Sequence, residues 1–171
     1  MHHNFKNQFK ISDFSKVELV IFDFDGVFTD NTVYVSDQGI EVVRCWRSDG
    51  LGIRRLKDCN TQIYVVSTEL NPVVSVRAKK LGIPYKQGVS NKALAVCAIC
   101  EELNIKAQDA VFLGNDINDI PAFMTVGFPV AVRDAYPEVL HYVKYRTKAP
   151  GGFGAVRELC DIVYQSKTAM A

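Results

Sequence analysis

Two aspartates, Asp23 and Asp25, stand one residue apart at the end of the apolar run VELVIFDFDG, and Gly26 follows them directly. Carboxylates at the end of a buried strand cost free energy unless another group compensates them. A carboxylate there can attack phosphorus and form an aspartyl phosphate. The second one returns to the same side of an extended chain and could protonate a leaving alkoxide and later deprotonate water. Gly26 would let the chain turn and a phosphate approach its main chain.

Further polar residues follow other apolar runs. Ser67 ends TQIYVVS, the turn GNDIND carries Asn115, Asp116 and Asp119 after AVFL, and Lys92 begins a predicted helix. Ser67 could donate to phosphoryl oxygens, and Lys92 could neutralise their charge in the transition state. Two carboxylates beside a phosphate repel one another, which a divalent cation with hard oxygen ligands relieves; Mg²⁺ fits phosphoryl transfer best. The candidate ligands are Asp23, Asp25, Asn115, Asp116 and Asp119.

Each of these residues alone also has an ordinary structural interpretation. The two aspartates of D-x-D could cap a loop, a lone serine or lysine is more often capping or exposed, and Asp116 and Asp119 could simply form a turn. The order of the set and its placement at strand and helix ends favour phosphate chemistry.

Short apolar runs alternate with helical patterns along the chain, which predicts an α/β domain with a mainly parallel sheet. The clearest predictions are strands over 17–23, 61–67 and 109–116, a β-hairpin over 31–46, and helices over 48–59, 69–83, 90–103 and 151–165. In such sheets the ligand site lies outside the carboxyl ends of the strands. The polar residues described above stand where the predicted strands stop.

Length and composition set the general class. With 171 residues, 48% hydrophobic and 23% charged, and a net charge of +1, the chain predicts one globular domain without a basic excess for nucleic acid. Its apolar runs are too short to span a bilayer and its start resembles no signal peptide, so we expect a cytoplasmic protein. Cys97 and Cys100 form a C-x-x-C inside a predicted helix, and buried thiols are favoured over a zinc site there.

The motifs DFDGV, VVS, Lys92 and GNDIND resemble those of the haloacid dehalogenase superfamily of phosphatases. The resemblance covers residues 17–164, and is closer to the small sugar-acid phosphatases in DGVFTD, SDGLGI, RAKKLGI and PGGFGAVRE. It implies a single Rossmann-like domain over 17–167 with a hairpin insertion and no large cap, after an N-terminal extension over 1–16. It also implies an Mg²⁺-dependent phosphatase with Asp23 as nucleophile and Asp25 as acid/base.

Members of this branch are typically tetramers, and the resemblance implies the same assembly here. Residues 31–46 would be the assembling hairpin. Gly151, Gly152 and Arg157 would belong to a segment that helps close a neighbour's site. A plain helix-entry turn is the structural alternative for GGFG.

The residues after Ser67 bear on the substrate. Octulosonate 8-phosphate phosphatases usually carry T-G-R there, whereas this chain has Ser67, Thr68 and Glu69. Nine-carbon sugar-acid phosphatases are similar in having this glutamate and a lysine eleven residues later, here Lys80. The resemblance therefore favours a nonulosonate or N-acylneuraminate 9-phosphate, with 3-deoxy-D-manno-octulosonate 8-phosphate as the alternative. Arg77, one turn before Lys80, could pair with the substrate carboxylate, unless the helix simply presents a solvated basic face.

Asn115 departs from the family pattern, which usually has a direct Mg²⁺ ligand aspartate there. An amide oxygen is a permissible ligand, but the site loses a negative charge. This departure leaves open a weakly active tetramerisation domain partnering a CMP-sugar-acid synthetase (acylneuraminate cytidylyltransferase). The intact D-x-D favours the enzyme.

Overall fold

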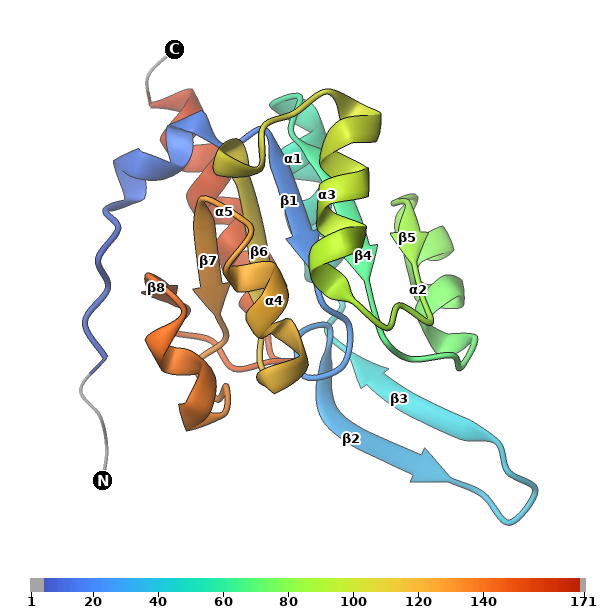
Figure 1. The fold of residues 1–171 in the computed structure, drawn as a ribbon. Helices are drawn as coiled ribbons and strands as arrows, with labels where there is room; N and C mark the ends of the chain where they lie inside the picture. The colour runs from blue at the N-terminus through green and yellow to red at the C-terminus, as the bar shows by residue number, and fades with distance from the viewer. Residues whose placement is uncertain (1–4, 170–171) are drawn as a thin grey trace.

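A six-stranded sheet, in which every neighbouring pair of strands is parallel, forms the centre of the molecule (Figure 1). The computed structural model describes residues 5–169. The strands are β1 (Leu19–Phe22), β4 (Gln62–Val66), β5 (Tyr85–Lys86), β6 (Ala110–Gly114), β7 (Phe128–Ala131) and β8 (Tyr145–Arg146), in the order β5-β4-β1-β6-β7-β8. The predicted α/β class is therefore confirmed.

Helices cover both faces of the sheet and divide the core in two. They are α1 (Asp49–Asp58), α2 (Val73–Leu81), α3 (Lys92–Leu103), α4 (Ile120–Phe123) and α5 (Ala155–Thr168), with the 3₁₀ helices η1 (Ile11–Lys16), η2 (Ala107–Asp109), η3 (Ile117–Asp119) and η4 (Pro137–His141). Strand β1 alternates between the two cores. Val20 and Phe22 pack with α1, α2 and α5, while Leu19 and Ile21 pack with α3 and α4. A strand buried on both faces reads as the continuous apolar run seen in the sequence.

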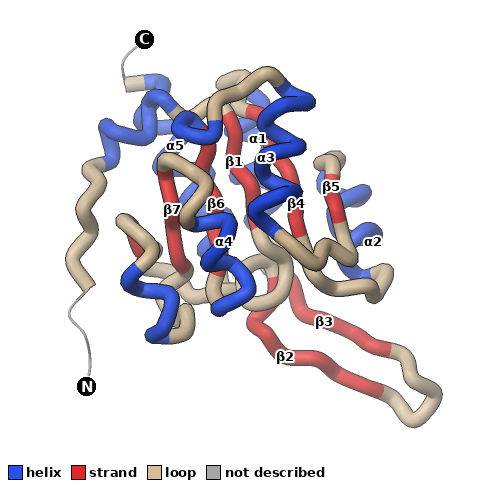
Figure 2. Tube along the Cα trace, in the orientation of Figure 1, coloured by secondary structure: helices blue, strands red, loops and turns tan. Residues whose placement is uncertain are grey.

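Strands β2 (Thr29–Val35) and β3 (Glu41–Cys45) form a separate antiparallel hairpin, which projects from the end of the sheet (Figure 2). It starts two residues before the predicted 31–46. Its apolar side chains are exposed: Val33, Tyr34, Val35, Ile40 and Val42. The described chain has no large cap domain over the sheet.

The segment before the sheet is joined to the domain. Phe14 of η1 is fully buried, and its ring centroid lies 5.5 Å from that of Phe128 on β7. Helix η1 also packs against α5. Residues 11–16, expected to belong to an extension, therefore contribute to the core; residues 1–4 of that extension lie outside the described part.

The five cysteine thiols are free. Cys100 is buried as expected, but the prediction for Cys97 is wrong, because this thiol is exposed. The inner face of α3 consists of Ala95, Val96, Ile99 and Cys100, and position 97 falls outside that stripe. None of the helices among residues 5–169 is both long and apolar enough to cross a membrane.

Candidate active site

The ends of three adjacent strands bring the predicted residues together. Strand β1 lies between β4 and β6, so Asp23, Ser67 and Asn115 follow neighbouring strands at the same edge of the sheet. The chain passes from β1 to β4 and β5 on one side and then returns to β6 on the other. Such a reversal leaves a crevice at the carboxyl ends, where ligands bind in open α/β sheets.

Lys92 joins two of the carboxylates. Its Nζ lies 2.7 Å from Asp23 Oδ1 and 2.6 Å from Asp119 Oδ1, and all three side chains are almost fully buried. The pKa of Asp23 is raised to about 7, mainly by burial and then by the negative charge of Asp119, while Lys92 opposes both effects. Burial alone would lower the pKa of Lys92, but Asp23 and Asp119 raise it. The lysine is thus the fixed positive charge of the site.

The turn GNDIND is organised by Asp119. Its Oδ2 accepts the main-chain N–H groups of Asn115 (2.8 Å) and Asp116 (3.2 Å). With its other oxygen on Lys92, Asp119 orients the turn. The carboxylate of Asp116 accepts the N–H of Ile117 at 2.7 Å. Both oxygens of Asp119 and one oxygen of Asp116 therefore have protein partners in this arrangement.

Three oxygen positions converge beside Asp23. Asn115 Oδ1 lies 3.0 Å from the main-chain oxygen of Asp25 and 3.2 Å from Asp23 Oδ2. Oxygen ligands at right angles around Mg²⁺, each about 2.1 Å from the ion, lie about 3 Å apart, so these residues fit a Mg²⁺ site. With the amide turned over, its nitrogen would donate to the same two oxygens, which satisfies them without a metal. Among the described residues, no group of three or more His, Cys, Asp and Glu could hold a metal.

Gly26 leaves room for this arrangement. It adopts φ +77°, and a Cβ there would collide with the Asn115 amide. Glycine is thus required both by the left-handed turn and by the close approach of Asn115.

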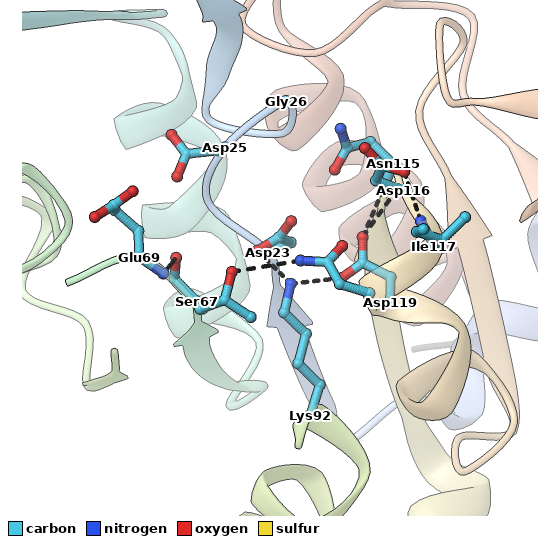
Figure 3. Close-up of polar contacts among 12 residues, drawn as sticks. Asp23, Asp25, Gly26, Ser67, Glu69, Lys92, Asn115, Asp116, Ile117 and Asp119 are labelled. Atoms are coloured by element: carbon cyan, nitrogen blue, oxygen red, sulfur yellow. Dashed lines mark hydrogen bonds and ion pairs between the residues drawn. The ribbon is translucent and has the colours of Figure 1, made fainter. Parts of the chain in front are cut away.

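Asp25 lies on the opposite side of Asp23 from Asn115, Asp116 and Asp119, together with Glu69 (Figure 3). Burial raises the pKa of Asp25, and Glu69 raises it further. The Thr29 hydroxyl lies 3.5 Å from Asp25 Oδ1 and also accepts the N–H of Gly26 at 3.1 Å. Sequence reasoning missed Thr29, although it stands in the quoted stretch DGVFTD. A carboxyl that favours its protonated form is suited to general-acid chemistry.

The loop after β4 places Ser67 and Glu69 beside the two aspartates (Figure 3). Ser67 is buried, and its Oγ accepts the N–H of Glu69 at 3.1 Å. Thr68 is exposed, and its hydroxyl accepts from Asn118 at 3.4 Å. Glu69 Oε1 accepts the N–H groups of Leu70 (2.6 Å) and Asn71 (2.7 Å).

Two predicted substrate residues lie further away on α2. Arg77 donates from Nη2 to the main-chain oxygen of Trp46 at 2.9 Å, and its Nε is buried with no hydrogen-bond partner among residues 5–169. Lys80, in the last turn of α2, lines a cavity of about 690 Å³ between α1 and α2, together with Arg47, Arg54 and Lys57. The structure of this chain therefore does not bring Lys80 to the catalytic carboxylates. Glu69 lies in the loop before α2, whereas Lys80 lies in the last turn of that helix.

The glycines of PGGFG pack against the chain's own loop after Asp25. The N–H of Gly152 donates to Val27 O at 3.0 Å, and a Cβ on Gly151 would collide with the main-chain oxygen of Gly26. Arg157, in the first turn of α5, donates from its main-chain N–H to Asp49 Oδ1 at 3.2 Å. Within this chain the segment supports its own active-site loop.

Comparison with known proteins identifies relatives of this chain. Residues 81–156 match the family model described as haloacid dehalogenase-like hydrolase. The chain is 34% identical over 154 residues to 3-deoxy-D-manno-octulosonate 8-phosphate phosphatase of Escherichia coli strain K12, covering 90% of this chain and 82% of that protein.

Solved structures share the fold. A crystal structure described as a haloacid dehalogenase family hydrolase from Streptomyces avermitilis is 42% identical, with a TM-score of 0.84 over 86% of this chain and 84% of that one. The 3-deoxy-D-manno-octulosonate 8-phosphate phosphatase of Moraxella catarrhalis is 28% identical, with a TM-score of 0.88 over 92% of both chains. That structure was solved in complex with a magnesium ion, a phosphate ion and a molecule of the octulosonate, abbreviated KDO.

Proposed function

Since this chain belongs to the haloacid dehalogenase-like hydrolase family and is a phosphatase of the octulosonate 8-phosphate phosphatase type, we propose that it removes the terminal phosphate of a 2-keto-3-deoxy sugar acid through an aspartyl phosphate. The observation that carries this proposal is the buried Asp23–Lys92–Asp119 cluster, with Asp25 on the side facing Glu69 (Figure 3). It provides a nucleophile, a fixed cation and a separate proton donor at one edge of the sheet.

In the first step a carboxylate oxygen of Asp23 attacks phosphorus, and the bond from phosphorus to the sugar oxygen breaks. The protonated Asp25 gives its proton to the leaving oxygen. Burial raises the pKa of Asp25, which favours the protonated form that donates this proton. Lys92 stays beside Asp23 at 2.7 Å and offsets the negative charge of the transferring group.

In the second step Asp25, now ionised, removes a proton from water, and the water oxygen attacks phosphorus. The bond from phosphorus to Asp23 breaks, which releases inorganic phosphate and restores the carboxylate. Thr29 keeps the Asp25 side chain near its main-chain turn in both steps. Ser67 is placed to donate its hydroxyl proton to a phosphoryl oxygen, because its Oγ only accepts a bond from Glu69 within the protein.

Asp23, Asn115 and the main-chain oxygen of Asp25 would hold Mg²⁺, and Asp119 would orient the turn that carries Asn115. The ion, when bound, supplies positive charge that lets a phosphate approach these carboxylates. Asp116 directs one oxygen to Ile117 and would act from outside this set.

The substrate class follows from the relatives and the S-T-E sequence together. The curated relative acts on 3-deoxy-D-manno-octulosonate 8-phosphate, which makes this compound the first substrate to assay. Glu69 beside Asp25 supports a nine-carbon nonulosonate or N-acylneuraminate 9-phosphate instead, because the nine-carbon phosphatases that this chain resembles carry glutamate where octulosonate phosphatases carry arginine. The Arg77 Nε, buried without a partner, is the group in this chain suited to the substrate carboxylate.

We further propose assembly into a homotetramer through the hairpin. Its exposed apolar side chains, Val33, Tyr34, Val35, Ile40 and Val42, are between 49% and 65% accessible and lie on a projecting arm that the described chain leaves uncovered. Contiguous apolar surface of this kind marks an interface. Replacing Val35 and Val42 by lysine should shift the mass measured by light scattering toward the monomer; an unchanged mass would reject the hairpin as the interface.

Phosphate release from a panel of sugar-acid phosphates, with and without chelator, tests the activity. We expect turnover of at least one eight- or nine-carbon acid, loss with chelator, and loss of at least about 10³-fold in Asp23→Asn. A wild-type enzyme that hydrolyses none of these acids, or an Asp23→Asn variant as active as wild type, contradicts the proposal. Wild-type inactivity with retained tetramer formation would instead favour the assembly role alongside a synthetase.

A further inference from the structure

Glu41 of the hairpin contacts the loop that follows the catalytic serine. Asn71 Nδ2 donates to Glu41 Oε2 at 2.9 Å, although the two residues lie thirty positions apart in the chain. Glu41 begins β3, part-way along the projecting arm, and Asn71 stands two residues before α2. A hydrogen bond to an ionised carboxylate is stronger than one between neutral groups, so this contact ties the arm to the site.

The other groups of Asn71 are also used. Its Oδ1 accepts the N–H of Val73 at 3.1 Å, and its own N–H donates to Glu69 Oε1 at 2.7 Å. Since Glu69 in turn donates its N–H to Ser67 Oγ at 3.1 Å, a continuous set of hydrogen bonds leads from the catalytic loop to the hairpin. The set fixes the two glutamates relative to each other.

One carboxylate oxygen of each glutamate remains available. Within residues 5–169, neither Glu41 Oε1 nor Glu69 Oε2 accepts a hydrogen bond, and both residues are only half-buried. Both carboxylates also act electrostatically on Asp25. Burial is the largest cause of the raised pKa of Asp25, and the negative charges of Glu69 and Glu41 raise that pKa further. Glu69 points toward the same side as Asp25 (Figure 3). The Glu69 side chain thus lies on the side of the acid, and Asn71 ties Glu41 to the loop that carries Glu69.

The leaving group must lie on that side, because Asp25 protonates its oxygen. Ionised carboxylates accept hydrogen bonds and donate none, so they select hydroxyl groups and disfavour anions. We propose that Glu41, held by Asn71, is a specificity-determining residue that binds hydroxyl groups of the leaving polyol together with Glu69. This inference rests on the proposed phosphatase function and adds the hairpin to its substrate site. The carboxylate of a sugar acid is expected to point away from Glu41.

The test compares two substrates that differ in the leaving group. One is the best sugar-acid phosphate from the panel, and the other is p-nitrophenyl phosphate, which has no aliphatic hydroxyl groups. We expect Glu41→Ala and Asn71→Ala to lower kcat/KM for the sugar phosphate about tenfold, mainly by raising KM. For the aryl phosphate we expect the same variants to lower kcat/KM by about twofold at most. Glu41→Gln, which keeps an acceptor oxygen, should recover part of the loss. Asp37→Asn, at the exposed tip of the same arm, is the matched control and should change neither substrate.

Equal losses on both substrates would show a merely structural role for Glu41 and overturn the inference, as would no loss on either. Light scattering on each variant shows whether a loss of kcat/KM comes from a changed assembly rather than from the missing side chain. If no sugar acid is turned over but another polyol phosphate is, the proposed substrate class fails while Glu41 is still tested on that polyol. If only the aryl phosphate is hydrolysed, there is no polyol to bind and the inference is overturned.

Discussion

Replacing Asn115 by aspartate restores the residue that the family pattern has at this position and adds one negative charge beside Asp23. The new carboxylate oxygen would lie 3.2 Å from Asp23 Oδ2 and 3.0 Å from the main-chain oxygen of Asp25. The amide of the natural chain can turn its nitrogen toward both oxygens when no metal is bound. A carboxylate cannot, because it has no donor unless it is protonated.

The magnitude follows from these distances. Two unit charges 3.2 Å apart repel by about 5 kcal/mol at an effective dielectric constant of about 20. Protonating the new aspartate at an ordinary pKa would cost about 4 kcal/mol at pH 7, which sets a ceiling on the loss of stability. Protonating Asp23 instead costs less, because its pKa is already raised to about 7. For a chain of this length each kcal/mol lowers Tm by about 2–4 °C. We therefore expect Asn115→Asp to melt several degrees below wild type in chelator.

Adding Mg²⁺ should reverse the order of stability. The variant offers the ion one more negative charge, so we expect its Mg²⁺ affinity to rise at least about tenfold, which corresponds to about 1.4 kcal/mol. Thermal melts across a Mg²⁺ titration measure both effects without relying on turnover. Asp116→Asn is the control, because its side chain can still accept from Ile117 N, and its Mg²⁺ affinity should change less than about threefold.

Equal Mg²⁺ affinity in Asn115→Asp and wild type would show that residue 115 does not contact the ion. A larger loss of affinity in Asp116→Asn than any change at residue 115 would assign the ligand to Asp116. Either result refutes the oxygen arrangement on which the site was built.

Three further changes test the site and its supports. Lys92→Ala leaves the carboxylates of Asp23 and Asp119 buried without their cation. It should lower the free energy of unfolding, measured in urea, by about 3–5 kcal/mol. An unchanged urea midpoint would contradict a stabilising role for these two ion pairs. Burial raises the pKa of Asp49 from 3.8 to about 7, so the folded state binds more protons and its stability falls as pH rises between these values, by at most about 1.4 kcal/mol per pH unit. Asp49→Asn should remove that part of the slope in unfolding measured from pH 4 to 8, and parallel curves would reject it. Gly151→Ala, whose Cβ would meet the main-chain oxygen of Gly26, should lose more than about 2 kcal/mol, against about 1 kcal/mol for Gly39→Ala, where a Cβ has open space; equal losses would exclude contact with the Gly26 loop as the cause.

Much of the fold was present in local patterns. The apolar run before Asp23 predicts a strand buried on both faces, and the alternation of runs predicts a parallel sheet, as the structure shows. Pro72 and Gly82 bracket α2, because proline suits a helix start and glycine adopts the left-handed cap, here at φ 62°. The same apolar runs also located the polar residues at the strand ends, because these residues stand where the runs stop.

Other features depended on contacts that no local pattern contains. Lys80 stands eleven residues after Glu69, but Glu69 lies in the loop before α2, and the last turn of that helix places Lys80 at a cavity beside α1. Cys97 is exposed because the stripe of α3 that meets the sheet passes beside it. The 2.9 Å contact between Glu41 and Asn71 joins a hairpin to a loop thirty residues away.

The sequence by itself determined the kinds of chemistry this protein can carry and the sheet edge where that chemistry lies, because residue type and strand periodicity are local properties. The tertiary structure decided which oxygens face one another. Lys92 bridges Asp23 and Asp119 only because β1, β6 and α3 pack together. The Asn115 amide meets Asp23 and Asp25 only because Gly26 leaves it room. Such contacts arise from the packing of distant segments, and packing is a property of the whole chain.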